Sequence, residues 1–93
     1  MEFLVRSELH VPASVSPEQL QETIAQERER GLELRASGAI VRIWRAPGRR
    51  DSVAIYEARD ATHLHELLAS LPVWPWLSCT VEPLAHHYLE DER

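Results

Sequence analysis

Hydrophobic and polar residues alternate along four short stretches of the chain, and two longer stretches repeat their hydrophobic residues at helical spacing. The first stretch, residues 3–11, has an apolar side chain at almost every second position, which is typical of a strand with one buried face. Residues 39–45, 52–57 and 77–82 show the same kind of pattern. The pattern therefore predicts four strands.

Two helices are predicted between these strands. The first begins at Ser16, a capping serine followed by Pro17, and it ends at Gly38, because glycine tolerates the left-handed conformation found at helix ends. The second begins after Asp60, which can cap free N–H groups, and it ends before Pro72. Its apolar face is formed by Leu64, Leu67, Leu68 and Leu71.

The order strand–helix–strand–strand–helix–strand is the split βαβ, or ferredoxin-like, pattern. We therefore expect one α+β domain over residues 1–93, with two helices on one face of a four-stranded antiparallel sheet and a tail, about residues 86–93, extending from it. Alternation predicts that the helices cover Phe3, Val5, Leu9, Val41, Ile43, Val53, Ile55, Cys79 and Val81. The opposite face is expected to carry Leu4, Ile40, Trp44, Ala54 and Tyr56. An uncovered sheet face with tryptophan and tyrosine favours a homo-oligomer.

Composition narrows the function classes. The formal net charge of −5 argues against a nucleic-acid partner, which requires a basic surface. No stretch approaches the roughly 20 apolar residues of a membrane span, and the N-terminal residues lack the pattern of a signal peptide, so a cytoplasmic protein is expected. All ten basic residues are arginine, which excludes lysine Schiff-base chemistry, and the single cysteine excludes an internal disulfide.

The histidines and the cysteine do not predict a metal site. His63 and His65 are two positions apart on a helix, and His86 and His87 are adjacent, so neither pair has the spacing of a zinc site. The three glycines are scattered and form no phosphate-binding loop. We therefore expect neither a metal nor another cofactor.

Glu27 is the most informative single residue. It falls in the middle of an apolar helical stripe that contains Leu20, Ile24 and Leu34. A carboxylate is costly to bury there, and burial would raise its pKa toward the range that suits a general base. The alternative is that Glu27 lies at the edge of the stripe and reaches water.

Several other residues are candidates for binding. Arg45 ends the second strand on the helix-covered side, where it can bind a substrate carboxylate, neutralise Glu27 or lie in solvent. Arg49 and Arg50 follow a turn and either form a solvated loop or attract an anion. Trp76, which lies in a proline-flanked connector, can form a pocket wall or simply pack.

Three segments give the chain a resemblance to a known family. The sequence Trp-Arg-Ala-Pro-Gly at residues 44–48, the pair Leu64-His65 and the sequence Leu-Pro-Val-Trp-Pro-Trp at residues 71–76 resemble the muconolactone isomerase family. The match continues to Val81, Leu84 and His87, and it covers nearly the whole chain.

This resemblance implies a ferredoxin-like subunit in a dimeric α/β-barrel, with dimers assembled further into decamers. It implies a cofactor-free double-bond shift in a small unsaturated lactone with a carboxymethyl arm, in bacterial catabolism of aromatic compounds. Glu27 would then be the proton shuttle, and Arg45 would bind the anion or stabilise a dienolate. The remaining substrate-binding candidates are Trp44, Arg50, Ser52, His65 and Trp76.

Three positions depart from the family pattern, and one of them is Arg49, which stands where a histidine is expected. Arg50 and Ser52 stand where catabolic members resemble one another in carrying a tyrosine and an asparagine. Three interpretations therefore stay open: an isomerase of muconolactone or a related lactone; a lyase, dehalogenase or cyclase acting on another small anionic substrate; and a non-catalytic ligand-binding module.

Overall fold

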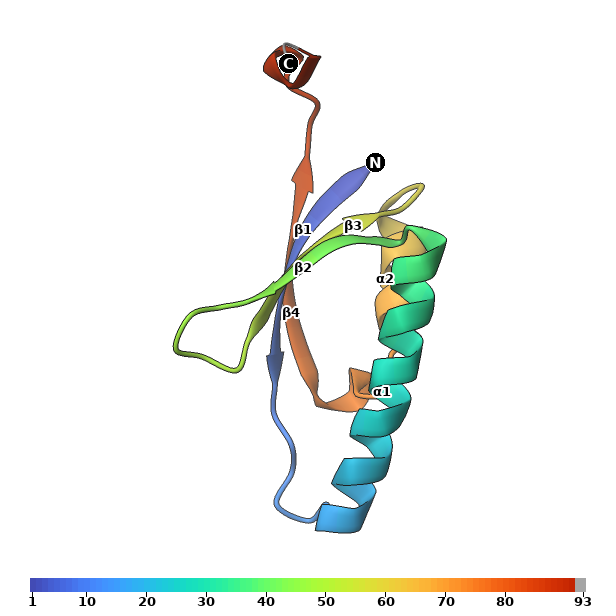
Figure 1. Ribbon diagram of the computed structural model, residues 1–93, viewed down its shortest axis with the longest axis vertical. Coiled ribbons are helices and arrows are strands. Elements are labelled where there is room, and N and C mark those ends of the chain that lie inside the picture. The colour runs from blue at the N-terminus through green and yellow to red at the C-terminus, as the bar shows by residue number, and fades with distance from the viewer. Residues whose placement is uncertain (92–93) are drawn as a thin grey trace.

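The computed structural model describes residues 1–91 and consists of two layers, a four-stranded sheet with two helices on one face (Figure 1). The elements are β1 (Glu2–Leu9), α1 (Pro17–Ser37), β2 (Ile40–Arg45), β3 (Ser52–Glu57), α2 (Ala61–Ala69) and β4 (Leu77–Leu84), with two short 3₁₀ turns, η1 (Trp74–Trp76) and η2 (Tyr88–Asp91). The strand order is β2-β3-β1-β4, and every neighbouring pair is antiparallel. The predicted ferredoxin-like architecture is therefore confirmed.

The ends of both helices follow from local hydrogen bonds. The Ser16 hydroxyl accepts from the backbone N–H of Gln19, and the Gln19 side chain accepts from the Ser16 N–H, both at 3.1 Å. This reciprocal pair satisfies two of the free donors at the start of α1. Gly38 ends the helix at φ 85°, the left-handed conformation predicted for it. In α2, the Asp60 carboxylate accepts from the N–H of His63 at 2.8 Å.

The core lies between the helices and the sheet, and it reveals an error in the predicted face of β3. Val53 and Ile55 were expected under the helices, but Ala54 and Tyr56 lie there instead, with exposed fractions of 3% and 5%. Pairing with β1 decides this, because Ala54 lies opposite Val5 and Tyr56 lies opposite Phe3. Both alternating sets of β3 are apolar, so the sequence pattern alone does not fix the face.

An irregularity in β2 produces a second correction. The register with β3 shifts between Ile40 and Arg42, so that Ile40 is buried in the core and Val41 is exposed. A bulge adds one unpaired residue to a strand, so the alternation of side-chain directions is interrupted at that residue. Ile40 therefore belongs to the covered face and Val41 does not, the reverse of the prediction for both.

The two helices do not cover the whole helix-facing side of the sheet. Ile43 and Val81 lie on the helix side by register, opposite Ala54 and Val5, but their exposed fractions are 48% and 44%. Both residues belong to the edge strands β2 and β4, over which the two helices do not extend fully. The buried part of the face consequently consists of its middle, on β1 and β3, together with Ile40 at the start of β2.

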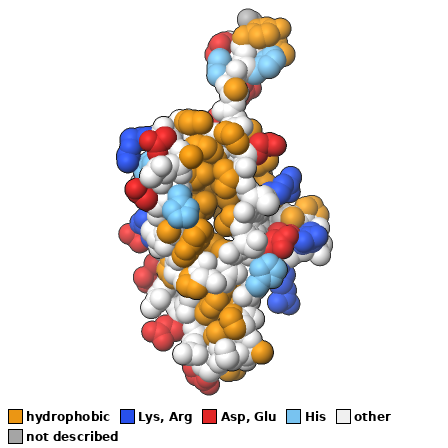
Figure 2. All heavy atoms as spheres, turned by 180° about the vertical axis from the view of Figure 1, so that it is seen from behind, with side chains coloured by type: hydrophobic (Ala, Val, Ile, Leu, Met, Phe, Trp, Pro, Cys, Tyr) orange, Lys and Arg blue, Asp and Glu red, His pale blue; other side chains and the backbone are white. Residues whose placement is uncertain are grey.

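Residues 85–91 extend away from the body of the protein beyond β4 (Figures 1 and 2). The side chains of Tyr88 and Leu89 in this tail are 68% and 57% exposed. The tail was predicted over about residues 86–93, of which 92 and 93 lie outside the described residues. None of the helices described in residues 1–91 has the length and apolar character needed to cross a membrane.

Candidate active site

Glu27 lies on the inner face of α1, close to the connector that follows α2. Its Oε1 atom accepts a hydrogen bond from the backbone N–H of Val73 at 3.2 Å. Burial raises the pKa of the Glu27 carboxyl, and the hydrogen bond from Val73 offsets part of this rise. Only Oε1 is engaged within residues 1–91, so Oε2 is left free to take a proton.

The apolar stripe predicted for α1 is only partly correct. Leu34 is buried and Leu20 is half-buried, but Ile24 is 43% exposed and lies outside the inner face. The inner face instead includes the polar residues Thr23 and Arg30 on either side of Glu27. The middle of α1 therefore presents polar groups to the sheet, and its last turns present the apolar contact.

A row of polar side chains crosses the helix-facing side of the sheet, one from each strand. The pairings Arg45 with Ser52, Ser52 with Ser7, and Ser7 with Cys79 place these residues side by side in strand order. The Ser7 Oγ and Cys79 Sγ atoms are 3.5 Å apart. We call Arg45, Ser52, Ser7 and Cys79 the polar row. It lies on the same side of the sheet as Glu27.

Two apolar rows continue the helix-facing surface beyond the polar row. The first contains Ile43, Ala54, Val5 and Val81, and the second contains Ile40, Tyr56, Phe3 and Pro83. The face thus changes from polar at one end to apolar at the other. The middle of both apolar rows is packed core, because Ala54, Val5, Tyr56 and Phe3 are each no more than 5% exposed.

Arg45 belongs to a cationic hollow at the end of the sheet. A cavity of about 610 Å³ is lined by Leu9, Val11, Arg45, Arg49 and Arg50. The Arg45 Nη1 atom donates to the carbonyl oxygen of Arg50 at 2.5 Å, and this bond holds the guanidinium near the turn. Arg49 pairs with Asp51 at 2.6 Å, whereas the guanidinium of Arg50 makes no ion pair within residues 1–91.

The structure does not join Glu27 and Arg45 directly. Among the described residues no ion pair links the two side chains, so Arg45 does not neutralise the carboxylate. Both nevertheless face the layer between the helices and the sheet.

Three further candidates lie elsewhere on the chain. Trp44 is on the open face of the sheet, 46% exposed, with the Arg42 guanidinium 5.0 Å from its ring. His65 is exposed on α2, and its ring meets the edge of Trp74 at 5.4 Å. Trp76 is half-buried against α1, where it lines a groove with Thr23. Of these three, Trp76 alone lies against the inner stripe that carries Glu27.

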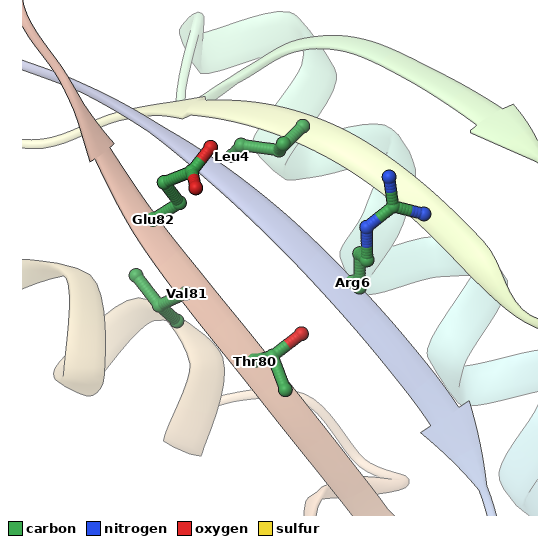
Figure 3. Close-up of a pocket in the computed structure, with 5 residues that line it drawn as sticks. All are labelled: Leu4, Arg6, Thr80, Val81 and Glu82. Atoms are coloured by element: carbon green, nitrogen blue, oxygen red, sulfur yellow. The ribbon is translucent and has the colours of Figure 1, made fainter.

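The open face carries a separate hollow of about 250 Å³ between β1 and β4 (Figure 3). Leu4 pairs with Glu82 and Arg6 pairs with Thr80, and all four side chains project on the side away from the helices. This hollow is separated from Glu27 by the sheet. It therefore does not belong to the site under α1.

Two residues on the helix-facing side of the sheet, Tyr56 and Ser7, were not predicted as site residues. Tyr56 was missed because the alternation of β3 placed it on the wrong face. Ser7 was missed because a single serine in a strand gives no signal until its neighbours across the sheet are known. The pairing of β1 with β3 and β4 provides the missing information.

The fold and this site together define a small ferredoxin-like subunit with a half-buried carboxylate, Glu27, on the inner face of its first helix. The chain belongs to the muconolactone delta-isomerase family, which it matches over residues 1–90.

Comparisons with individual proteins agree with this family membership. The chain is 35% identical to the muconolactone delta-isomerase of Rhodococcus opacus, covering 91% of each chain. It is 30% identical to that of Acinetobacter baylyi, covering 94% of this chain and 91% of the other. A crystal structure of muconolactone isomerase superposes with a TM-score of 0.86 at 25% identity, over 94% of this chain and 91% of the other.

A more distant structure shares the fold alone. It is a 5-chloro-2-hydroxyhydroquinone dehydrochlorinase from Burkholderia phenoliruptrix. Its TM-score is 0.64 and its identity is 19%, with coverage of 94% of this chain and 96% of the other.

Proposed function

We propose that this protein is a cofactor-free isomerase that shifts a double bond in muconolactone or a closely related carboxylated lactone. The observation that carries the proposal is Glu27, a half-buried carboxylate on the inner face of α1 that accepts a hydrogen bond from the Val73 N–H and whose pKa is raised by burial. Membership of the muconolactone delta-isomerase family supplies the substrate class.

In the proposed mechanism, Glu27 moves one proton between two carbons of the lactone. Its carboxylate removes the proton from the ring carbon that bears the carboxymethyl arm, and the electrons shift through the conjugated system onto the carbonyl oxygen. The resulting dienolate takes the proton back from Glu27 at the carbon next to the carbonyl. A raised pKa suits both steps, because the group must accept and release a proton near neutral pH.

The Val73 N–H holds the carboxylate in place for this transfer. A hydrogen bond to Oε1 fixes the carboxyl plane, so Oε2 can approach the reacting carbons without reorganisation. Val73 is itself buried and follows Pro72, which keeps the connector rigid. The base is therefore positioned by the backbone of another element.

Arg45 is proposed to bind the carboxylate of the carboxymethyl arm. It ends the polar row next to Ser52, and Arg50 adds a second cation to the same hollow. Replacing Arg45 with Gln is expected to raise KM by roughly 10-fold or more with a smaller change in kcat, because the lost contact is made equally in ground and transition states. Steady-state kinetics measure this. Arg28→Gln, an exposed change on the outer side of α1, is the matched control; equal KM values for the two variants would contradict the role of Arg45.

We also propose that the active form is a homo-oligomer. Hydrophobic side chains gather over the body when it is viewed from behind (Figure 2). The large apolar residues exposed on the sheet include Val41, Ile43, Trp44 and Val81. A single chain of 10.7 kDa that leaves these side chains in water gains stability by covering them with another copy.

The direct test is turnover of (+)-muconolactone by the purified protein, with no metal or cofactor added. Loss of the signal of the ring proton in NMR is expected to accompany formation of the isomeric lactone. Light scattering on the same sample should give a mass of at least twice the 10.7 kDa of one chain. A folded oligomer that leaves muconolactone unchanged would contradict this substrate assignment and direct the search to other anionic ligands.

A further inference from the structure

The inner face of α1 makes a second polar contact close to Glu27, which the proposed mechanism does not yet use. One helical turn beyond Glu27, the Arg30 Nε atom donates a hydrogen bond to the hydroxyl oxygen of Ser70 at 3.1 Å. Ser70 is the residue that ends α2. The Arg30 Nη1 atom also lies 3.8 Å from a carboxylate oxygen of Glu33 on its own helix, so the guanidinium is held from two sides.

Ser70 is fixed at the end of α2 by hydrogen bonds of its own. Its hydroxyl donates to the carbonyl oxygen of Leu67 at 2.6 Å, so the hydroxyl oxygen is left to accept from Arg30. Its backbone N–H donates to the carbonyl oxygens of Glu66 and Leu67 at 3.1 and 3.2 Å. A group that bonds to the Ser70 hydroxyl is therefore attached to the end of α2 itself.

The connector from Ser70 to Val73 is short and rigid. Leu71 and Val73 are 7% and 4% exposed, and the φ angle of Pro72 between them is fixed by its ring. The backbone N–H of Trp74 donates to the carbonyl oxygen of Leu71 at 2.9 Å, which closes the connector into a turn. The place of the Val73 N–H therefore depends on where Ser70 is held.

Two hydrogen bonds thus join α1 to this connector in register. Glu27 and Arg30 are three residues apart on α1, and their partners Val73 and Ser70 are three residues apart as well, in the opposite direction. Three residues of a helix advance by about 4.5 Å, so the two contacts are neighbours. One hydrogen bond would let the connector pivot, whereas two fix both its distance from α1 and its direction.

We propose that Arg30 and Ser70 are positioning residues for Glu27: their hydrogen bond holds the end of α2 against α1 and so keeps the Val73 N–H on the Glu27 carboxylate. The catalytic part of this inference rests on the proposed function, because it makes a contact between two helices part of the proton-transfer machinery. Neither Arg30 nor Ser70 touches the substrate in this role. Without their contact, the Val73 N–H is less often in place and the carboxyl plane loses its fixed direction.

Ser70→Ala is the variant that isolates this role. It removes the acceptor of the Arg30 hydrogen bond and leaves every charge in place. Arg30→Gln is less informative, because the loss of a nearby cation raises the pKa of a carboxyl by itself. The matched control is Ser37→Ala, since the Ser37 hydroxyl also donates to a carbonyl three residues back, that of Leu34, at 3.1 Å. The side-chain hydrogen bonds of Ser37 stay within residues 34–39.

The neighbouring ionisable groups can be separated from Glu27 in a titration. Arg30 carries its charge at every accessible pH. Tyr56 and Cys79 lie on the side of the sheet that faces α1, and phenols and thiols ionise in the alkaline range. His65 is exposed on α2 and its ring lies beside the connector, so a charge on this ring can also move a connector signal. The variant Glu27→Gln distinguishes this effect, because it keeps His65.

The first test needs no substrate. The backbone amide signal of Val73 in ¹H–¹⁵N NMR spectra should shift with pH as Glu27 ionises, and Glu27→Gln should lack this shift. In Ser70→Ala the shift is expected to be smaller and its midpoint to lie at higher pH, because the N–H that favours the charged carboxylate is less often in place. Ser37→Ala should match the wild type. Identical Val73 titrations in Ser70→Ala and the wild type would overturn the inference, even if Ser70→Ala melted at a lower temperature, because a purely structural contact predicts that result.

The second test measures kcat and KM for muconolactone against pH in the wild type, Ser70→Ala and Ser37→Ala. For Ser70→Ala, the acidic limb of kcat/KM is expected to lie at higher pH than in the wild type. Its kcat should fall by roughly fivefold, the effect of one lost hydrogen bond, while KM changes by less than about twofold. Equal profiles for Ser70→Ala and an active wild type would overturn the positioning role. An inactive wild type would instead overturn the proposed function, and the Val73 titration would then decide alone whether Arg30 and Ser70 position Glu27.

Discussion

Replacing Glu27 with glutamine is expected to lower kcat for lactone isomerisation by ~10³-fold or more while leaving the fold intact. Glutamine keeps the shape of the side chain, and its amide oxygen can still accept the hydrogen bond from Val73. It cannot take a proton from carbon, however, so the chemical step loses its base. Single-turnover kinetics followed by NMR measure the loss of the chemical step, and circular dichroism measures the fold.

The matched control is Glu22→Gln, which removes the same charge from an exposed position on the same helix. It should keep wild-type turnover. If Glu27→Gln and Glu22→Gln were equally active, Glu27 would have no part in proton transfer.

The pH dependence gives a second measure of the same group. Burial raises the pKa of Glu27, so the carboxylate is lost at a higher pH than in an exposed glutamate whose ordinary value is 4.5. The acidic limb of kcat/KM for the wild type should accordingly lie above pH 4.5. A limb at or below this pH would mean that another group controls the reaction.

The same pKa shift predicts the effect of Glu27 on stability. A pKa that is raised in the folded state means that the folded protein binds this proton more tightly than the unfolded chain does. The resulting stabilisation is fully present below the unfolded pKa and is lost as the pH rises through the folded pKa. Glu27→Gln should therefore be at least as stable as the wild type at neutral pH, even though it is inactive.

The second large effect is expected at Leu34, the fully buried residue of α1. Replacing Leu34 with alanine removes a side chain that is 2% exposed and packs in the same cluster as Phe3 and Ile40. The lost burial and the cavity left behind should cost about 3 kcal/mol of unfolding free energy. For a domain of this size, this corresponds to a fall in Tm on the order of 15 °C, measurable by calorimetry.

Leu32 provides the control on the same helix, because its side chain is 54% exposed. Leu32→Ala removes the same atoms but opens no cavity, so a loss below about 0.5 kcal/mol is expected. Equal destabilisation by the two variants would contradict the view that Leu34 alone anchors α1 to the core.

Local signals fixed much of this structure before any tertiary contact was known. The capping box at Ser16 and the glycine at position 38 define α1, and Asp60 defines the start of α2, because hydrogen bonds between near neighbours decide helix ends. The order of elements then limited the fold to the ferredoxin-like arrangement. Glu27 was also identifiable, because it falls on the helical stripe of Leu20 and Leu34, although Thr23 and Arg30 make the middle of that stripe polar.

The tertiary structure alone decided which side chains of the sheet face α1. The two alternating sets of β3 are both apolar, so the sequence left the orientation of Tyr56 open, and only pairing with β1 turned it toward α1. The polar row depends on the same pairing, since Ser7 is distant in sequence from Ser52 and Arg45 and meets them only across the sheet. Local propensity sets where an element begins and ends. The neighbours of each side chain depend instead on strand register, which is a property of the assembled sheet.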